Sequence, residues 1–230
     1  MRIHNLSLGL ARAYLVEHEA GLALVDAGSP GMEKVVLQTM QEISRQDLRI
    51  IVITHAHLDH YGSAAALRRA TGAPVAVHLA DASAMQRGDS PLGSPRGRGR
   101  LVKALFPLIN FILHPEPVTP DLSLDDGDDL SSYGVPIKVL HTPGHTPGSC
   151  CYILADRWAF VGDLLSTTGG PHMQRYFAQD WAMIPASLNR LKALHPEKIY
   201  PGHGTDLLDG EVLQLLGSSS TQSGAGYRNA

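Results

Sequence analysis

The stretch Ile51-Val52-Ile53-Thr54-His55-Ala56-His57-Leu58-Asp59-His60 joins an apolar run to a dense group of polar side chains. The three apolar residues at its start predict the end of a buried strand. Four side chains of metal-binding type then follow within six positions: His55, His57, Asp59 and His60. A turn that leaves a rigid strand can present several side chains to one point. We therefore expect two adjacent metals, with His55 and His57 on one and Asp59 and His60 on the other.

Ordinary packing is the alternative explanation, because a single histidine in such a run is more often a polar or capping residue than a ligand. Three histidines and one aspartate in six positions are hard to explain by packing, since each brings a polar group that needs a partner. Imidazole and carboxylate ligands without thiolate suit zinc, and also iron or manganese. The sequence therefore predicts two divalent metal ions, with zinc as the first expectation.

Composition limits the classes of protein to which the chain can belong. With 230 residues, 43% hydrophobic and 18% charged, the chain is typical of a soluble globular protein of one domain. The formal net charge of −3 gives no reason to expect nucleic acid as a partner. We find no run of ~20 apolar residues, so no membrane span is expected. The residues after Met1 lack a long apolar segment, so no signal peptide is expected. A cytoplasmic location is expected, with Cys150 and Cys151 as buried free thiols in a strand.

Strands and helices are expected to alternate along the first half of the chain, which predicts an α/β layered fold. A second, strand-rich half follows. Expected strands lie at residues 13–16, 22–25, 50–53, 74–78, 137–140, 151–154, 158–161 and 198–200. Expected helices lie at about 31–45, 64–70 and 184–194.

Residues of ligand type recur where the expected strands end. His145 follows residues 137–140, Asp163 follows residues 158–161, and His203 follows residues 198–200. Asp26 also stands at a strand end, where it is either a turn-capping group or a support for a metal-bound histidine. Together with the run at 55–60, four separate apolar strands are therefore each expected to end in a turn that bears a residue of ligand type.

Between residues 86 and 117 the composition changes, and we expect a loop or lid inserted into a domain of residues 1–215. Residues 88–100 are rich in Gly, Pro and Ser and carry three arginines, which is typical of a mobile surface loop. Residues 101–113 are nearly all apolar and are interrupted by Pro107. Three alternatives remain for them: a helix packed on the core, a lid over the active site, or the surface of a homodimer. Residues 216–230 are expected to form a disordered tail.

Together these motifs resemble the metallo-β-lactamase superfamily over about residues 10–205. The motifs are His-x-His-x-Asp-His at 55–60, Thr-Pro-Gly-His-Thr-Pro-Gly with His145, Gly-Asp with Asp163 and Pro-Gly-His-Gly with His203. The resemblance implies a four-layer αββα sandwich with the metals at one edge between the sheets. It assigns His55, His57 and His145 to the first metal, Asp59, His60 and His203 to the second, and Asp163 to a bridge. It also favours Asp26 as a support of the site.

The resemblance further implies a hydrolase of the glyoxalase II-like or lactonase-like branch. Such an enzyme cleaves an ester, thioester or lactone bond of a small molecule through a metal-bridging hydroxide, which Asp59 would orient. The helical domain with which full-length glyoxalase II binds glutathione is not expected here. His172 is a candidate substrate contact, whereas His141 is expected to be structural. The main alternative is an iron-dependent oxidoreductase resembling sulfur dioxygenases; nuclease and β-lactamase activities are less favoured.

Overall fold

Two six-stranded sheets form the centre of the molecule in the computed structural model, which describes residues 1–205 and 207–216. The first sheet has the order β1-β2-β3-β4-β5-β7. Its strands are β1 (Arg2–Leu8), β2 (Ala11–His18), β3 (Gly21–Val25), β4 (Leu48–Ile53), β5 (Val75–His78) and β7 (Leu122–Leu124). The first three strands are antiparallel, whereas β3, β4, β5 and β7 run parallel. The predicted strands of the first half are confirmed.

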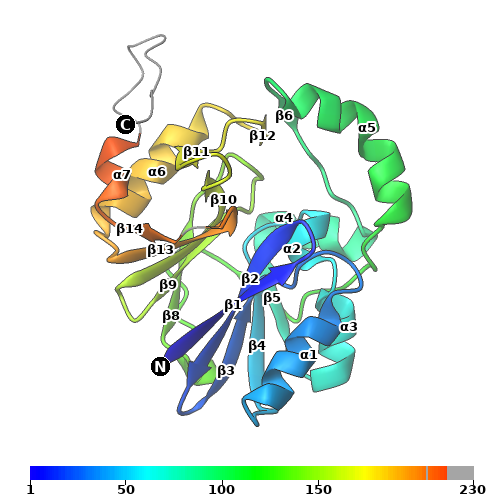
Figure 1. Ribbon diagram of the computed structural model, residues 1–230, viewed down its shortest axis with the longest axis vertical. Helices are drawn as coiled ribbons and strands as arrows, with labels where there is room; N and C mark the ends of the chain where they lie inside the picture. The colour runs from blue at the N-terminus through cyan, green and yellow to red at the C-terminus, as the bar shows by residue number, and fades with distance from the viewer. Residues whose placement is uncertain (206, 217–230) are drawn as a thin grey trace.

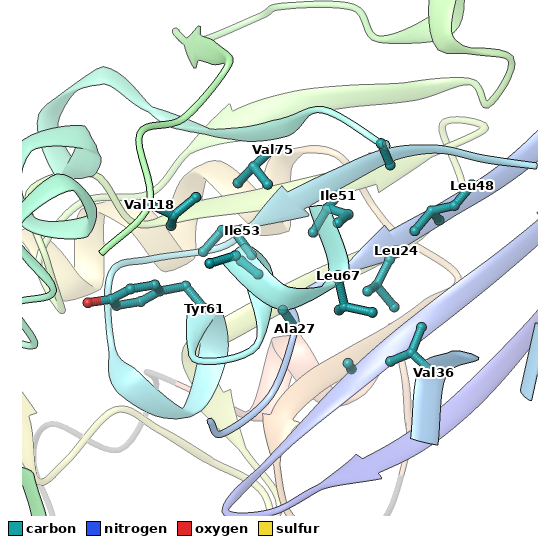
Figure 2. Packing of buried hydrophobic residues seen from close by; sticks show 14 of the residues in the cluster. Leu24, Ala27, Val36, Leu48, Ile51, Ile53, Tyr61, Leu67, Val75 and Val118 are labelled. Atoms are coloured by element: carbon teal, nitrogen blue, oxygen red, sulfur yellow. The ribbon is translucent and has the colours of Figure 1, made fainter. Parts of the chain in front are cut away.

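The central strands of this sheet are buried on both faces, because their apolar residues alternate between two hydrophobic clusters. In β4, Ile51 and Ile53 pack on one side and Ile50 and Val52 on the other. This period of two is the geometry of a strand, and strands covered on both faces read as continuous apolar runs. Figure 2 shows the outer side, where Ile51 and Ile53 lie near Leu67 of the neighbouring helix.

The second sheet has the order β14-β13-β10-β9-β8, with β11 paired to β10. Its strands are β8 (Ile137–His141), β9 (Cys150–Leu154), β10 (Trp158–Ser166), β11 (His172–Met173), β13 (Lys198–His203) and β14 (Leu208–Asp209). Cys150 and Cys151 are buried free thiols in β9, as predicted. Residues of both sheets form one hydrophobic cluster, in which Tyr152 and Phe160 pack with Val25. The two sheets therefore face each other.

Helices cover the outer face of each sheet (Figure 1). The first sheet carries α1 (Glu33–Glu42), α3 (Ala64–Thr71) and α4 (Leu79–Arg87), and the second carries α6 (Met183–Ala193) and α7 (Val212–Leu215). The short α2 (Leu58–Tyr61) and the 3-10 helix η1 (Ser131–Tyr133) lie in connections. The result is the predicted four-layer αββα sandwich.

The apolar segment 101–113 forms most of a helix, α5 (Gly99–Ile112), which lies at the periphery of the molecule in Figure 1. The prediction that Pro107 interrupts this segment is wrong, because α5 continues through it. Proline removes the hydrogen bond to the carbonyl four residues earlier, that of Lys103. Both residues are exposed, so water can satisfy this carbonyl. The predicted tail at 216–230 lies outside the described residues, apart from Leu216.

Candidate metal centre

The predicted ligands gather at the edge where parallel strands of both sheets end. His55, His57, Asp59 and His60 follow β4 in the first sheet, and β10 and β13 run parallel in the second. Asp163 and His203 differ from the expectation, since they lie within β10 and β13 rather than in turns after them. His145 lies in the turn between β8 and β9. Carboxyl ends of parallel strands meet at one edge, which is why segments far apart in the sequence converge here.

A first cluster contains three buried histidines. His55 Nε2 lies 3.1 Å from His57 Nδ1 and 3.2 Å from His145 Nε2, and the latter two atoms are 3.0 Å apart. Asp163 Oδ2 lies 3.3 Å from His145 Nε2. Four potential ligand atoms, from His55, His57, His145 and Asp163, thus surround one point.

A second cluster, Asp59, His60 and His203, lies beside the first. His203 Nε2 is 3.4 Å from Asp59 Oδ2 and 3.1 Å from Asp163 Oδ1, and His60 Nε2 is 3.3 Å from the same Oδ1 atom. Asp163 therefore turns one carboxylate oxygen to each cluster. All seven predicted ligands lie together, and their role as ligands stays a prediction.

In each histidine, the ring nitrogen that points away from the cluster has a polar partner that fixes the ring. His57 Nε2 lies 2.9 Å from Pro91 O, His145 Nδ1 2.9 Å from Phe177 O and His203 Nδ1 3.1 Å from Leu10 O. His60 Nδ1 lies 2.8 Å from Asp26 Oδ2, and His55 Nδ1 3.1 Å from Thr54 Oγ1. A carbonyl or carboxylate can only accept a hydrogen bond, so the ring nitrogen beside it carries the N–H. In the neutral ring the opposite nitrogen then has the free lone pair that a metal needs. These contacts explain why His57 presents Nδ1 to the cluster, whereas the others present Nε2.

The first cluster in particular fits a divalent cation, because its three facing histidine nitrogens cannot satisfy one another. Three lone pairs meet in the first cluster, and acceptor beside acceptor is unfavourable without a shared cation. Within the described residues, His60 Nε2 and Asp163 Oδ1 are buried atoms without a hydrogen-bond partner. Imidazole and carboxylate donors are the ligands of zinc, iron and manganese.

Electrostatics differ between the clusters. Burial lowers the pKa of His57 to about 4, with a further contribution from His145, and burial also lowers the pKa values of His55 and His145. Burial opposes the charge on His203 too, but the Asp163 carboxylate outweighs it and raises the pKa of His203 to about 9. Asp26 likewise holds the pKa of His60 above its usual range against burial. The three histidines of the first cluster are therefore neutral near pH 7, whereas His60 and His203 of the second cluster are protonated when no metal is bound.

Asp26 braces the second cluster. Its Oδ1 accepts a 2.8 Å hydrogen bond from Thr54 N, and its Oδ2 accepts from His60 Nδ1. Its φ of 61° is unusual for a residue with a side chain, and such strain persists only where the surroundings fix it. Gly202 packs closely against the His60 ring, and only glycine fits there, because a Cβ at this position would lie 2.7 Å from His60 Cε1.

Asp81, which the sequence analysis did not identify, braces the first cluster. Its Oδ2 accepts hydrogen bonds from Ala56 N at 2.8 Å and Thr146 Oγ1 at 2.7 Å, and its Oδ1 accepts from Gly148 N at 2.8 Å. This buried carboxylate thus ties the turn of His55 and His57 to the turn of His145. Asp81 lies in the first turn of α4, where an acidic residue is ordinary, so the local sequence gave no signal of this role.

The Gly/Pro-rich segment 88–100 is not merely a surface loop. Ser90 is buried and its Oγ accepts a 2.9 Å hydrogen bond from Leu58 N. The carbonyl oxygen of Pro91 accepts the hydrogen bond from His57 Nε2. Short strands β6 (Ser94–Pro95) and β12 (Phe177–Ala178) pair with each other, which ties this segment to the loop before α6. The segment therefore takes part in holding the site.

A cavity of about 290 Å³ opens beside both clusters. Five of the seven predicted ligands line it, and about half of the other lining residues are apolar. These apolar residues are Leu10, Leu58, Leu92, Val102, Phe106, Ile109 and Phe177. His172 also lines the cavity, with Nδ1 2.7 Å from Met173 O and Nε2 3.2 Å from Thr168 O. His141 lies outside it and stacks on His78, with ring centroids 3.9 Å apart.

The αββα fold and the His/Asp clusters at its strand ends define a class of metal-dependent hydrolases. The model of one family, described as the metallo-beta-lactamase superfamily, matches residues 7–203. The chain belongs to this superfamily, whose members bind divalent metal ions.

Several known proteins are similar to the chain. The probable metallo-hydrolase YflN of Bacillus subtilis is 26% identical over 88% of this chain and 83% of its own length. A hydroxyacylglutathione hydrolase of Aeromonas hydrophila is 31% identical over 83% of this chain, but the match spans only 59% of that enzyme. The solved structure of TTHA1623 in a di-iron-bound form is 29% identical, with a TM-score of 0.67 and coverage of 91% of this chain and 96% of that one.

Proposed function

We propose that the chain hydrolyses an ester, thioester or lactone bond of a small molecule that carries an apolar acyl group. The observation that carries this proposal is a cavity whose lining combines five of the proposed ligands with several apolar side chains. The relatives named hydroxyacylglutathione hydrolases favour a thioester. Because the match covers 59% of one such enzyme, glutathione itself does not follow from it.

Two divalent metals would be held by the residues of the two clusters, with His55, His57 and His145 at the first and Asp59, His60 and His203 at the second. Asp163, with one oxygen toward each cluster, would bridge them. Bound metals supply Lewis acidity and lower the pKa of water towards neutrality. Zinc is the first candidate, with iron or manganese as alternatives.

The chain's own residues have separable roles in this proposal. Asp59 lines the cavity and can accept a proton or a hydrogen bond from the attacking water. Val102, Phe106 and Ile109 would bind the acyl group and exclude bulk water from the bond that is cleaved. Gln174 Nε2 lines the cavity and donates to Asp163 twice, to the backbone O at 3.2 Å and to the carboxylate Oδ2 at 3.4 Å, so it would help to position the bridging carboxylate.

Elemental analysis of protein purified without added metal is the first test, followed by a panel of ester, thioester and lactone substrates. About two metal ions per chain and turnover of one of these classes would support the proposal. Metal-loaded protein that hydrolyses none of them would contradict it.

Replacement of the proposed base gives a sharper test. Asp59→Asn keeps the size of the side chain but removes the carboxylate, and we expect kcat to fall by about 10²–10⁴-fold in a folded protein. Asp156→Asn, at an exposed turn, is the matched control and should leave turnover unchanged. Circular dichroism checks the fold of both variants, and full activity of Asp59→Asn would exclude the assigned role.

Iron-dependent oxidation is a second candidate function, because the similar TTHA1623 has been solved in a di-iron-bound form. Iron as the bound metal, one or two ions per chain, together with oxygen uptake would replace the hydrolase proposal.

We also propose the cytoplasm as the compartment, since the buried thiols of Cys150 and Cys151 suit a reducing environment. No helix in the described part of the chain is long and apolar enough to cross a membrane.

A further inference from the structure

Helix α5 presents two adjacent apolar rows, only one of which faces the cavity. Val102, Phe106 and Ile109 form the inner row and line the cavity. The outer row is defined as Leu101, Leu105, Leu108 and Ile112, at positions i, i+4, i+7 and i+11 of the helix. These side chains are 51–68% exposed, and the neighbouring Phe111 is 84% exposed. Large contiguous apolar surfaces of this kind mark interaction sites.

Basic residues flank the outer row. Arg96, Arg98, Arg100 and Lys103 are exposed, and residues 90–115 contain no acidic side chain. The segment therefore carries +4 in a chain of formal charge −3, which leaves −7 for the remainder. Within the described residues, none of these four cations forms an ion pair: Arg96 lies 4.1 Å over the Trp181 ring, and Lys103 Nζ donates to Gly93 O.

Charge and apolarity together select the partner. A second copy of the chain meeting this surface face to face would bring two segments of +4 together, which is repulsive. Nucleic acid would neutralise the arginines but would leave the outer row in water. An anionic lipid surface satisfies both features, because headgroup phosphates pair with Arg and Lys while Leu, Ile and Phe enter the acyl boundary.

We propose that α5 docks this protein on an anionic lipid surface through the outer row, Phe111 and the four flanking cations. The contact is peripheral, since α5 has 14 residues and lies along the surface of the protein. Arg and Lys near the outer row would remain at the level of the headgroups. The Trp181 ring beneath Arg96 suits the same boundary.

Docking would bring the mouth of the cavity close to the lipid, because the inner row of α5 is part of the cavity wall. A substrate with a long acyl chain could then enter from the membrane rather than from water. This consequence rests on the proposed function, whereas the docking itself does not. The test below measures binding without substrate, so its failure and the failure of the hydrolase proposal are distinguishable.

Flotation with vesicles tests the docking. The full chain should float with vesicles of phosphatidylcholine mixed with phosphatidylserine, less with phosphatidylcholine alone, and less again as salt is raised. Leu105→Glu and Leu108→Glu should each lower binding at least about tenfold. Leu79→Glu on α4 is the matched control, because Leu79 is 53% exposed and Leu105 is 51% exposed. This control should bind like the unchanged chain.

Charge reversal provides a second variant that does not alter any apolar contact. Arg98→Glu combined with Arg100→Glu should lower binding to the anionic vesicles at least about tenfold, whereas Lys34→Glu on α1 should not. Circular dichroism and thermal unfolding check that every variant is folded. Absence of flotation with anionic vesicles, an equal loss in the control variants, or a dimer that Leu105→Glu dissociates would each overturn the proposal.

Discussion

The two clusters of the candidate metal centre contain similar ligand types but lie in different environments. His55, His57 and His145 are almost inaccessible, at 1%, 4% and 1% exposure. In the second cluster His60 is also buried, but the side chains of His203 and Asp59 are 27% and 17% exposed. Burial keeps the three histidines of the first cluster neutral, whereas Asp26, Asp59 and Asp163 favour the protonated forms of His60 and His203.

This difference predicts that the two clusters hold their metals with different stability. A neutral, buried set of imidazoles is preorganised for a cation and needs no proton release near pH 7. The second cluster must exchange protons for its metal, and its exposure places it where substrate and water enter. We therefore expect the second metal to be the more labile one.

Removal of the shared carboxylate should affect both clusters at once. Asp163→Ala leaves the facing atoms of His145, His60 and His203 without their common partner. If metals supply several kcal/mol of transition-state stabilisation, we expect kcat/KM to fall by at least about 10³-fold, with a lower metal content. Elemental analysis and turnover measure this, with Asp156→Ala as control. Retention of two metals per chain would show that Asp163 does not bridge.

Replacement of the two bracing carboxylates should separate the clusters. Asp26→Asn should weaken the second metal by about 10–100-fold through His60, with a smaller effect on the first. Asp81→Asn should do the reverse, because Asp81 holds the turns that carry His57 and His145. Chelator titrations that resolve the two metals give the measurement. The same loss at both clusters in each variant would mean that they are not supported independently.

Acid should release the second metal before the first. Below the pKa of about 9 that His203 has without metal, its proton competes with the ion, so the apparent affinity of this cluster should fall about tenfold per pH unit. His57 becomes protonated only near pH 4, so the first cluster should hold its metal through the range from pH 8 to pH 6. Metal titrations at both pH values measure this. Parallel losses would contradict the electrostatic difference between the clusters.

Part of this architecture could be predicted from local sequence. The run 50–53 is apolar at every position, which is typical of a strand covered on both faces, and the ligand residues that follow it lie only a few positions apart. Both signals are local, because an apolar run and the spacing of ligand residues can be read within about ten positions of the sequence. The αββα fold followed from the motif resemblance rather than from periodicity alone.

Other features depend on contacts between segments far apart in the chain. Nothing near Asp81 in the sequence shows that its carboxylate joins Ala56 to Thr146, and nothing near Pro91 shows that its carbonyl orients His57. The helical course of residues 99–112 through Pro107 likewise depended on solvent exposure, which a local pattern does not report.

The sequence by itself determined which residue types could bind metal and that strands would carry them to one edge. The tertiary structure decided which nitrogen of each histidine faces the cluster, which carboxylates brace it, and which face of α5 remains exposed. Those features arise from hydrogen bonds and packing between distant segments, and they exist only once the two sheets have closed on each other.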